Sequence, residues 1–145
     1  MQKTDESIYK IVSASVKRHS MDIETWEKTK LWNEGNEETK NLLLSKIRLE
    51  INELPILYFF VDQEIWTVFT TRAVYSSNAE NVEKLEITNI KEYKFDVARF
   101  KGIAGNQSDF ITIKLKDGTF HKILYETGNP SMAAIYGIQT LVQIS

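Results

Sequence analysis

The sequence predicts an α+β domain, because three observations divide the chain into helices, then strands, then a last helix. Before Pro55, apolar residues recur at helical spacing. From Pro55 onwards, runs rich in aromatic and β-branched residues replace that spacing. The pairs Asp117-Gly118 and Asn129-Pro130 then mark a β-hairpin and the start of a final helix.

The length and composition indicate one domain that spans residues 1–145. A chain of 145 residues can bury enough surface for a single hydrophobic core, and no linker-like stretch divides it. We therefore expect a helical layer over residues 1–54, with the strands and the C-terminal helix over residues 55–145. The 18 basic and 20 acidic residues nearly balance, which argues against a general nucleic-acid binder.

The sequence contains no cysteine, which excludes disulfide bonds, thiolate metal sites and thiol nucleophiles. Its N-terminus lacks the apolar core of a secretory signal. The longest apolar run, residues 56–61, is far shorter than the roughly 20 residues of a membrane-spanning helix. We therefore expect a cytoplasmic protein without a transmembrane segment.

Two helices are predicted before Gly35. Thr4 or Asp5 can cap the first helix, which ends near His19. Its apolar stripe consists of Ile8, Ile11, Val12 and Val16. Asp22 is expected to cap a second helix that contains Trp26 and Trp32. Six residues separate these tryptophans, so they point to different faces of that helix, and at least one meets solvent or a second surface.

A third helix is predicted between Asn36, its expected N-cap, and Pro55, which ends it because proline lacks a backbone donor. Its apolar stripe consists of Leu43, Leu44, Ile47, Ile51 and Leu54. Such a stripe is too apolar to face water, so we expect it to be buried on the sheets or on another chain.

Six strands are predicted after Pro55. The first four cover Ile56–Val61, Glu64–Ser76, Val82–Ile90 and Tyr93–Phe100, with Leu85, Ile87, Phe95 and Val97 facing inward. A glycine-containing loop over Lys101–Ser108 leads to the hairpin. There a type I′ turn at Asp117-Gly118 would pair Leu115 with Phe120 and Ile111 with Leu124. One face of the hairpin would then carry Ile111, Ile113, Leu115, Phe120 and Leu124, interrupted only by Lys122.

The last helix is predicted to start with Asn129 as its N-cap and Pro130 at its first position. Its buried stripe consists of Met132, Ile135, Ile138, Leu141 and Val142.

Residues from about Glu64 to Val142 resemble bacterial pleckstrin-homology-like and GRAM-like domains. The residues Thr70-Thr71-Arg72-Ala73-Val74-Tyr75 are similar to that family's Thr-x-Arg-x-x-Tyr strand, and Leu85–Ile90 is similar to its next strand and turn. The Asp-Gly hairpin and the amphipathic C-terminal helix complete the resemblance.

The resemblance implies an antiparallel β-sandwich or partly open barrel of six to seven strands, with the C-terminal helix capping one open end. The N-terminal helices are additional to the family's minimal domain. A cystatin-like helix-on-sheet fold is the alternative.

The sequence offers no pattern for catalysis, so we expect a protein that is not an enzyme and uses no cofactor or metal. Its two histidines, His19 and His121, lie on different predicted elements, whereas a zinc site needs more ligands at closer spacing. The pairs Asp62/Glu64 and Asp5/Glu6 lie in solvated turn or cap positions, which does not favour acid–base chemistry. Gly102–Gly105 lacks the lysine of a P-loop.

Two groups of residues are candidates for binding. Trp32 precedes a helix break, where a large aromatic side chain can anchor an interface. Four basic residues crowd one strand and its loop, namely Lys91, Lys94, Arg99 and Lys101, and the hairpin adds Lys114, Lys116 and Lys122.

Three functions are therefore weighed. The first is a non-catalytic protein-binding module, either an inhibitor or immunity-type protein, whose partner is another protein or a second copy of this chain. The alternatives are a domain that binds lipid or anionic head groups and a small enzyme of unrecognised type. The acidic turn Asp62-Gln63-Glu64 would repel a polyanionic head group, so phosphoinositides are not expected as ligands.

Overall fold

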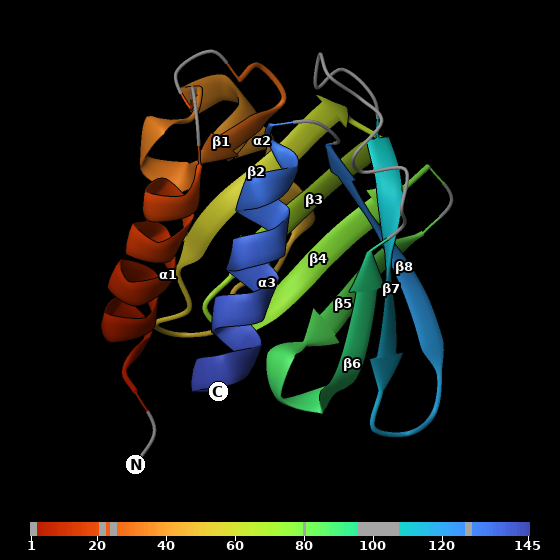
Figure 1. The fold of residues 1–145 in the computed structure, drawn as a ribbon. Coiled ribbons are helices and arrows are strands. Elements are labelled where there is room, and N and C mark those ends of the chain that lie inside the picture. Colours follow the sequence, from red (N-terminus) through yellow and green to blue (C-terminus); the bar gives the residue numbers. More distant parts are fainter. Residues whose placement is uncertain (1–2, 21–22, 24–25, 80, 96–107, 127–128) are drawn as a thin grey trace.

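A computed structural model describes residues 3–20, 23, 26–79, 81–95, 108–126 and 129–145 (Figure 1). Its helices are α1 (Asp5–His19), α2 (Glu37–Lys46) and α3 (Ser131–Ile144), and its 3-10 turns include η2 (Trp32–Glu34) and η3 (Ile87–Asn89). Its strands are β1 (Thr29–Leu31), β2 (Pro55–Asp62), β3 (Ile65–Thr70), β4 (Ala73–Asn78), β5 (Val82–Glu86), β6 (Ile90–Phe95), β7 (Ser108–Leu115) and β8 (Phe120–Glu126).

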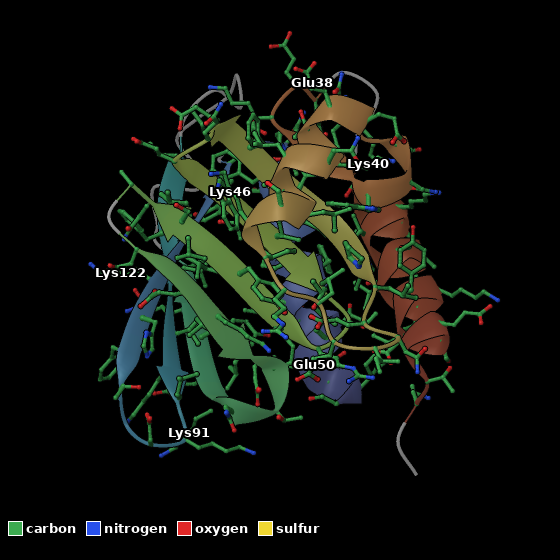
Figure 2. All side chains as sticks on the ribbon, turned by 180° about the vertical axis from the view of Figure 1, so that it is seen from behind. Glu38, Lys40, Lys46, Glu50, Lys91 and Lys122 are labelled. Carbon is green, nitrogen blue, oxygen red and sulfur yellow. The ribbon has the colours of Figure 1, made fainter. Side chains whose placement is uncertain are left out.

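The strands form two antiparallel sheets, which confirms the predicted α+β class. One sheet has five strands in the order β1-β2-β3-β4-β5, and the other has three in the order β6-β7-β8. Helices α1 and α3 lie side by side against one face of the five-stranded sheet (Figure 1), and α2 covers its other face (Figure 2). The eight described strands exceed the six to seven predicted.

Two hydrophobic cores result from this arrangement. The main core lies between the sheets, α1 and α3, and includes Val12, Phe69, Ile113 and Ile138. The second core lies under α2 and includes Leu43, Tyr58 and Trp66. Strands β2 and β3 are buried on both faces because they lie between these cores, which explains why they read as continuous apolar runs rather than alternating ones.

Helix α1 forms as predicted and packs antiparallel to α3. The Thr4 side chain caps α1 by accepting a hydrogen bond from the Ser7 backbone N–H at 3.1 Å. At the interface, the Thr140 hydroxyl donates to the Ser15 hydroxyl at 2.9 Å. One turn further along, the rings of His19 and Tyr136 stack with centroids 3.9 Å apart. These contacts fix both helices on the five-stranded sheet.

The predicted second helix is wrong where the structure describes it, although Asp22, its expected cap, lies outside the described residues. Thr29–Leu31 instead form the edge strand β1, in which Thr29 pairs with Phe59 and Leu31 with Leu57. Thr29 and Leu31 are buried, whereas Lys30 between them is partly exposed. Burial therefore alternates from one residue to the next, as in a strand. Pairing with β2 therefore overrides the helical spacing of the tryptophans.

The predicted third helix begins at Asn36 as expected but ends at Lys46, eight residues before Leu54. Of its predicted stripe, Leu43 is fully buried, whereas Leu44 is 40% exposed and Ile51 is 85% exposed. We call residues 47–54 the crossing segment, because they lead from α2 back to the sheet. Hydrogen bonds to the sheet, described below, hold this segment in place of further helical turns.

The predicted strand Glu64–Ser76 is in fact two strands, β3 and β4, joined by a tight turn. The Thr70 hydroxyl accepts hydrogen bonds from the backbone N–H groups of Arg72 and Ala73 at 3.1 and 3.0 Å. A threonine hydroxyl that accepts from backbone N–H groups two and three residues ahead closes a turn. The single strand predicted from the sequence did not allow for this turn.

The strand predicted over Val82–Ile90 is also interrupted, because residues 87–89 form η3 after β5. Leu85 and Ile87 are buried, as predicted. Strand β6 starts at Ile90 and is described to Phe95; Val97 and the rest of the predicted strand lie outside the described residues, as does most of the Lys101–Ser108 loop.

The β7–β8 hairpin forms, but its predicted register is wrong by one residue. Lys114 pairs with Phe120, and Ile111 pairs with Ile123. Gly118 has a φ of 89°, while Asp117 is not among the residues with positive φ, so the turn is not type I′. The N–H of Gly118 donates to the Leu115 carbonyl, and the N–H of Leu115 donates to the Thr119 carbonyl, as in a three-residue loop with a glycine bulge.

Helix α3 confirms the predicted C-terminal helix, with its start shifted by one residue. The helix begins at Ser131 and Pro130 takes the N-cap position, where Asn129 was expected. Ile138 and Leu141 of the predicted stripe are buried, but small residues such as Ala133, Ala134 and Gly137 fill much of the interface. At Gly137, an added Cβ atom would lie 3.3 Å from a Leu57 methyl carbon, so this glycine lets α3 lie close to β2.

Candidate functional site

The outer face of the three-stranded sheet carries two phenylalanines and three lysines, which we call the Phe–Lys face: Lys94, Phe110, Lys114, Phe120 and Lys122. The strand register places them together, because Lys94 pairs with Thr112, Thr112 with Lys122, and Lys114 with Phe120. The intervening residues Ile111, Ile113 and Ile123 are fully buried in the main core. Alternation along the strands therefore leaves the Phe–Lys face turned outward.

The two aromatic rings on this face are accessible to solvent. Phe120 is 65% exposed and Phe110 is 39% exposed. The Lys114 ammonium nitrogen lies 5.5 Å from the centre of the Phe120 ring, and the Lys122 nitrogen lies 5.6 Å from the centre of the Phe110 ring. Such cation–π distances hold the cations over the rings, so the face presents apolar and positively charged groups in alternation.

The charge of this face is mainly positive. One carboxylate shares this face: Glu92, two residues from Lys94 on β6, lies opposite Lys114 with 4.0 Å between the carboxylate oxygen and the lysine nitrogen. Lys91 is the extra residue of a bulge in β6 and is exposed. Figure 2 shows Lys91 and Lys122 toward different ends of the three-stranded sheet.

Of the four basic residues predicted as a cluster, the structure joins Lys94 to the hairpin lysines and places Lys91 at the sheet's margin. Arg99 and Lys101 lie outside the described residues. Sequence reasoning did not select the two exposed phenylalanines, and the type I′ register placed Phe120 on the same face as Ile111 and Ile113, which are buried. The alternative three-residue loop, Lys116-Asp117-Gly118, was the signal that would have exposed Phe120.

Trp32, the other predicted binding residue, lies in η2 and is half-buried in the second core. Its ring meets the Tyr58 ring edge-on, with centroids 5.9 Å apart and planes at 88°, a favourable geometry for aromatic packing. Trp26 is buried in the main core with 4% of its surface exposed. The two tryptophans thus pack in different cores. They do point in different directions, as predicted, but the predicted helix is not the reason.

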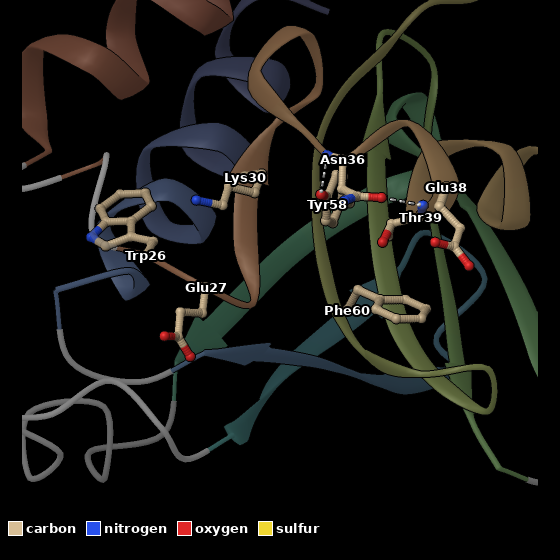
Figure 3. Close-up of a pocket in the computed structure, with 8 residues that line it drawn as sticks. All are labelled: Trp26, Glu27, Lys30, Asn36, Glu38, Thr39, Tyr58 and Phe60. Carbon is tan, nitrogen blue, oxygen red and sulfur yellow. Dashed lines mark hydrogen bonds between the residues drawn. The ribbon is translucent and has the colours of Figure 1, made fainter.

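A cleft of about 560 Å³ lies beside the start of α2 (Figure 3). In Figure 3, the ammonium end of Lys30 points toward Trp26 and away from Glu38. The Asn36 N–H donates to the Tyr58 hydroxyl at 3.2 Å, and the Asn36 side chain accepts from the Thr39 N–H at 3.1 Å. These polar groups position the first turn of α2, which is a structural role.

A second cleft, of about 600 Å³, lies between the start of α1, the β3–β4 turn and the C-terminal residues of α3. An ion network forms one wall. Arg72 donates to both carboxylate oxygens of Asp5, at 3.0 and 2.8 Å, and to Glu50 at 3.1 Å. These hydrogen bonds from Arg72 hold the pKa of Asp5 below its usual value. Because Arg72 already binds two carboxylates of this chain, we assign it a structural role.

Glu53 lies buried behind this network, with 4% of its surface exposed. Its carboxylate accepts hydrogen bonds from the Thr70 hydroxyl, from the Tyr75 hydroxyl at 3.0 and 3.2 Å, and from the Glu50 N–H at 2.9 Å. Burial, together with the Glu53 carboxylate, raises the pKa of Tyr75 well above its usual value, so its hydroxyl remains a donor. This cluster attaches the crossing segment to the sheet.

The residues of the Thr-x-Arg-x-x-Tyr pattern therefore act structurally in this chain. Thr70 closes the β3–β4 turn, Arg72 binds the start of α1, and Tyr75 binds Glu53. Within the described part of the chain, no three His, Cys, Asp or Glu side chains lie close enough to hold a metal ion. Likewise, no described helix is long and apolar enough to cross a membrane.

Comparison with models of protein families, with curated proteins and with solved structures found no match for this chain.

Proposed function

We propose that this protein is a non-catalytic protein-binding module that binds its partner through the Phe–Lys face. The observation that carries the proposal is Phe120, which begins the edge strand β8 and is 65% exposed on the outer face of the three-stranded sheet. Large aromatic side chains are enriched where protein interfaces are buried. The two exposed phenylalanines supply the aromatic groups that such an interface buries, and the neighbouring lysines supply charge that can steer a partner to it.

The proposed kinship with pleckstrin-homology-like and GRAM-like domains supports a binding role. Counted from β2, seven strands in two antiparallel sheets precede the C-terminal helix α3, which is the arrangement that the resemblance implies. Such a scaffold serves many interactions, so the site has to be argued from surface chemistry and not from the fold. We extend the proposal to an inhibitor or immunity-type protein because a small module acts by covering a surface of its partner.

The two other functions have less support. The β2–β3 turn is acidic and ordered, since the Asp62 carboxylate accepts from the Glu64 and Ile65 N–H groups at 2.8 and 3.0 Å. A negative group fixed in this way repels phosphoinositide head groups. For an enzyme, the buried carboxylate of Glu53 would have to be available, but it is already bonded to two hydroxyls and one N–H.

The proposal is tested by affinity capture of partners from the native cell, followed by quantitative mass spectrometry. The test variant replaces Phe110 and Phe120 with serine. The matched control, Leu44→Ser, removes a comparably exposed apolar residue from α2. A third arm, Trp32→Ala, tests the alternative surface that the sequence suggested.

We expect the double variant to lose a partner that the wild type, Leu44→Ser and Trp32→Ala retain. Equal recovery by the double variant would refute the Phe–Lys face as the binding surface. If Trp32→Ala alone loses the partner, the binding surface lies at Trp32, beside the second core. Analytical ultracentrifugation of the same proteins reports whether the partner is a second copy of the chain.

A further inference from the structure

We propose that the Phe–Lys face recognises an extended, acidic segment of a partner protein, in which carboxylates alternate with apolar side chains. This inference rests on the proposed function and adds the chemical class of the partner. It follows from the order of side chains along the two strands and from their charge.

The spacing on the face matches that of an extended chain. Along β8, Phe120 and Lys122 are two residues apart, and along β7, Phe110 and Lys114 flank Thr112. Side chains two residues apart on a strand are roughly 7 Å apart. A partner segment in the extended conformation repeats its side chains at the same interval. Along the strands the face offers the Phe120 ring, then Lys94 and Lys122 in one cross-strand row, then the Phe110 ring. The segment can therefore place an apolar group on each ring and a carboxylate between them, beside Lys94 and Lys122.

The charge on the face selects an acidic partner. Lys94, Lys114 and Lys122 contribute three cations, whereas Glu92, on the same side of β6 as Lys94, contributes one carboxylate that lies 4.0 Å from Lys114. The cations therefore outnumber the carboxylate. A basic segment would place like charges beside these lysines, which costs binding energy and slows association. An acidic segment gains attraction and a faster encounter rate.

The position of the rings favours a protein segment over a membrane. Phe110 and Phe120 lie in strands β7 and β8, with lysine nitrogens 5.6 and 5.5 Å from the ring centres. Membrane anchors insert their apolar side chains below the level of the charged groups. Here the cations lie beside the exposed rings, so a chain that follows the surface of the sheet can contact both.

The test uses fluorescein-labelled, end-blocked peptides at low ionic strength, with binding read by fluorescence anisotropy. The probe has the repeat Phe-Thr-Glu-Thr, which places phenylalanine and glutamate alternately on one face of an extended chain. One control peptide replaces glutamate with lysine, and a second replaces phenylalanine with alanine.

The protein variants are Lys122→Glu, Phe120→Ser and the matched charge reversal Lys46→Glu on α2, which covers the other face of the five-stranded sheet (Figure 2). We expect Lys122→Glu and Phe120→Ser each to weaken binding of the glutamate peptide about tenfold. Lys46→Glu should leave binding unchanged, and both control peptides should bind at least tenfold more weakly than the probe. Thermal unfolding checks that each variant is folded.

Equal binding of the glutamate and lysine peptides, or equal loss in Lys46→Glu, would overturn the inference. Sedimentation with phosphatidylserine vesicles that is lost in Lys122→Glu would overturn it in favour of a lipid ligand. The two proposals fail separately. If cellular capture depends on Phe110 and Phe120 but the glutamate peptide does not bind, the partner chemistry is wrong and the binding surface stands.

Discussion

The buried carboxylate of Glu53 provides a sharp test of how the crossing segment is held. Replacing Glu53 with alanine removes the acceptor for the Thr70 hydroxyl, the Tyr75 hydroxyl and the Glu50 N–H. The two hydroxyls have substitutes, because Thr70 also lies 3.1 Å from the Ala73 carbonyl oxygen and Tyr75 lies 3.3 Å from that of Arg48. The Glu50 N–H then loses the hydrogen bond that the structure gives it.

A hydrogen bond to a charged group contributes about 1.5–3 kcal/mol, and relief from burying the carboxylate offsets part of the loss. We therefore expect Glu53→Ala to lower the free energy of unfolding by about 2 kcal/mol. Tyr75→Phe, which removes one donor and leaves the carboxylate bonded to Thr70 and Glu50, should cost about 1 kcal/mol.

Urea denaturation of the wild type and both variants gives these free energies, provided that the dependence on urea concentration is unchanged. The exposed ion-pair variant Lys10→Ala is the control, because Lys10 and Glu6 are 73% and 76% exposed and such pairs contribute little. A loss below about 0.5 kcal/mol in Glu53→Ala would show that the Glu53 hydrogen bonds do not hold the crossing segment, since surface substitutions produce changes of that size.

Three further predictions concern single side chains. Gly118→Val should cost more than about 1 kcal/mol and Gly118→Asn much less, because the φ of 89° strains β-branched residues most; equal denaturation midpoints would contradict this. Gly35→Ala should cost about 1–3 kcal/mol, because its Cβ would lie 2.5 Å from the Tyr58 ring; an unchanged melting temperature and near-UV circular dichroism would contradict it. Burial raises the pKa of Glu126, which accepts a hydrogen bond from Thr29 at 2.7 Å, so its ionised form opposes folding. Glu126→Gln should therefore stabilise the protein at neutral pH, and the gain should shrink as the pH falls through the folded-state pKa of Glu126 towards its usual value of 4.5; a gain that is constant with pH would contradict this assignment.

The parts of the fold that the sequence predicted well are those fixed by local signals. Thr4 and Asn36 accept hydrogen bonds from N–H groups three residues ahead, as N-caps do, and they begin α1 and α2. Pro55 begins β2, and the proline-containing segment before Ser131 precedes α3. In each case a residue and its near neighbours determine the structure.

The errors occur where distant contacts decide. Thr29–Leu31 become a strand through pairing with β2, about thirty residues later in the chain. The crossing segment is held by Glu53 through Thr70 and Tyr75, and neither partner can be recognised from residues 47–54 alone. Helical spacing of apolar residues was misleading in both regions, because the contacts that override it lie elsewhere in the sequence.

The candidate site was half predictable. The basic residues of β6 and the hairpin are visible in the sequence, and Lys94 does join Lys114 and Lys122 on one face. The exposure of Phe120 depended on the hairpin register, and a shift of one residue exchanges the buried and exposed faces of a strand. A type I′ turn needs two residues with positive φ, whereas in this hairpin Gly118 has positive φ and Asp117 does not. The type I′ assignment therefore gave the wrong register and did not reveal that Phe120 is exposed.

Hydroxyl-radical footprinting of the protein alone and with its captured partner tests the binding surface most directly, because the reaction oxidises exposed aromatic side chains in proportion to their accessibility. We expect oxidation of Phe120 and Phe110 to fall on binding, whereas oxidation of Trp32 and Phe60 in the second core should be unchanged. Undiminished oxidation of Phe120 in the complex, with protection of Trp32 instead, would show that the partner binds beside the second core and not at the Phe–Lys face.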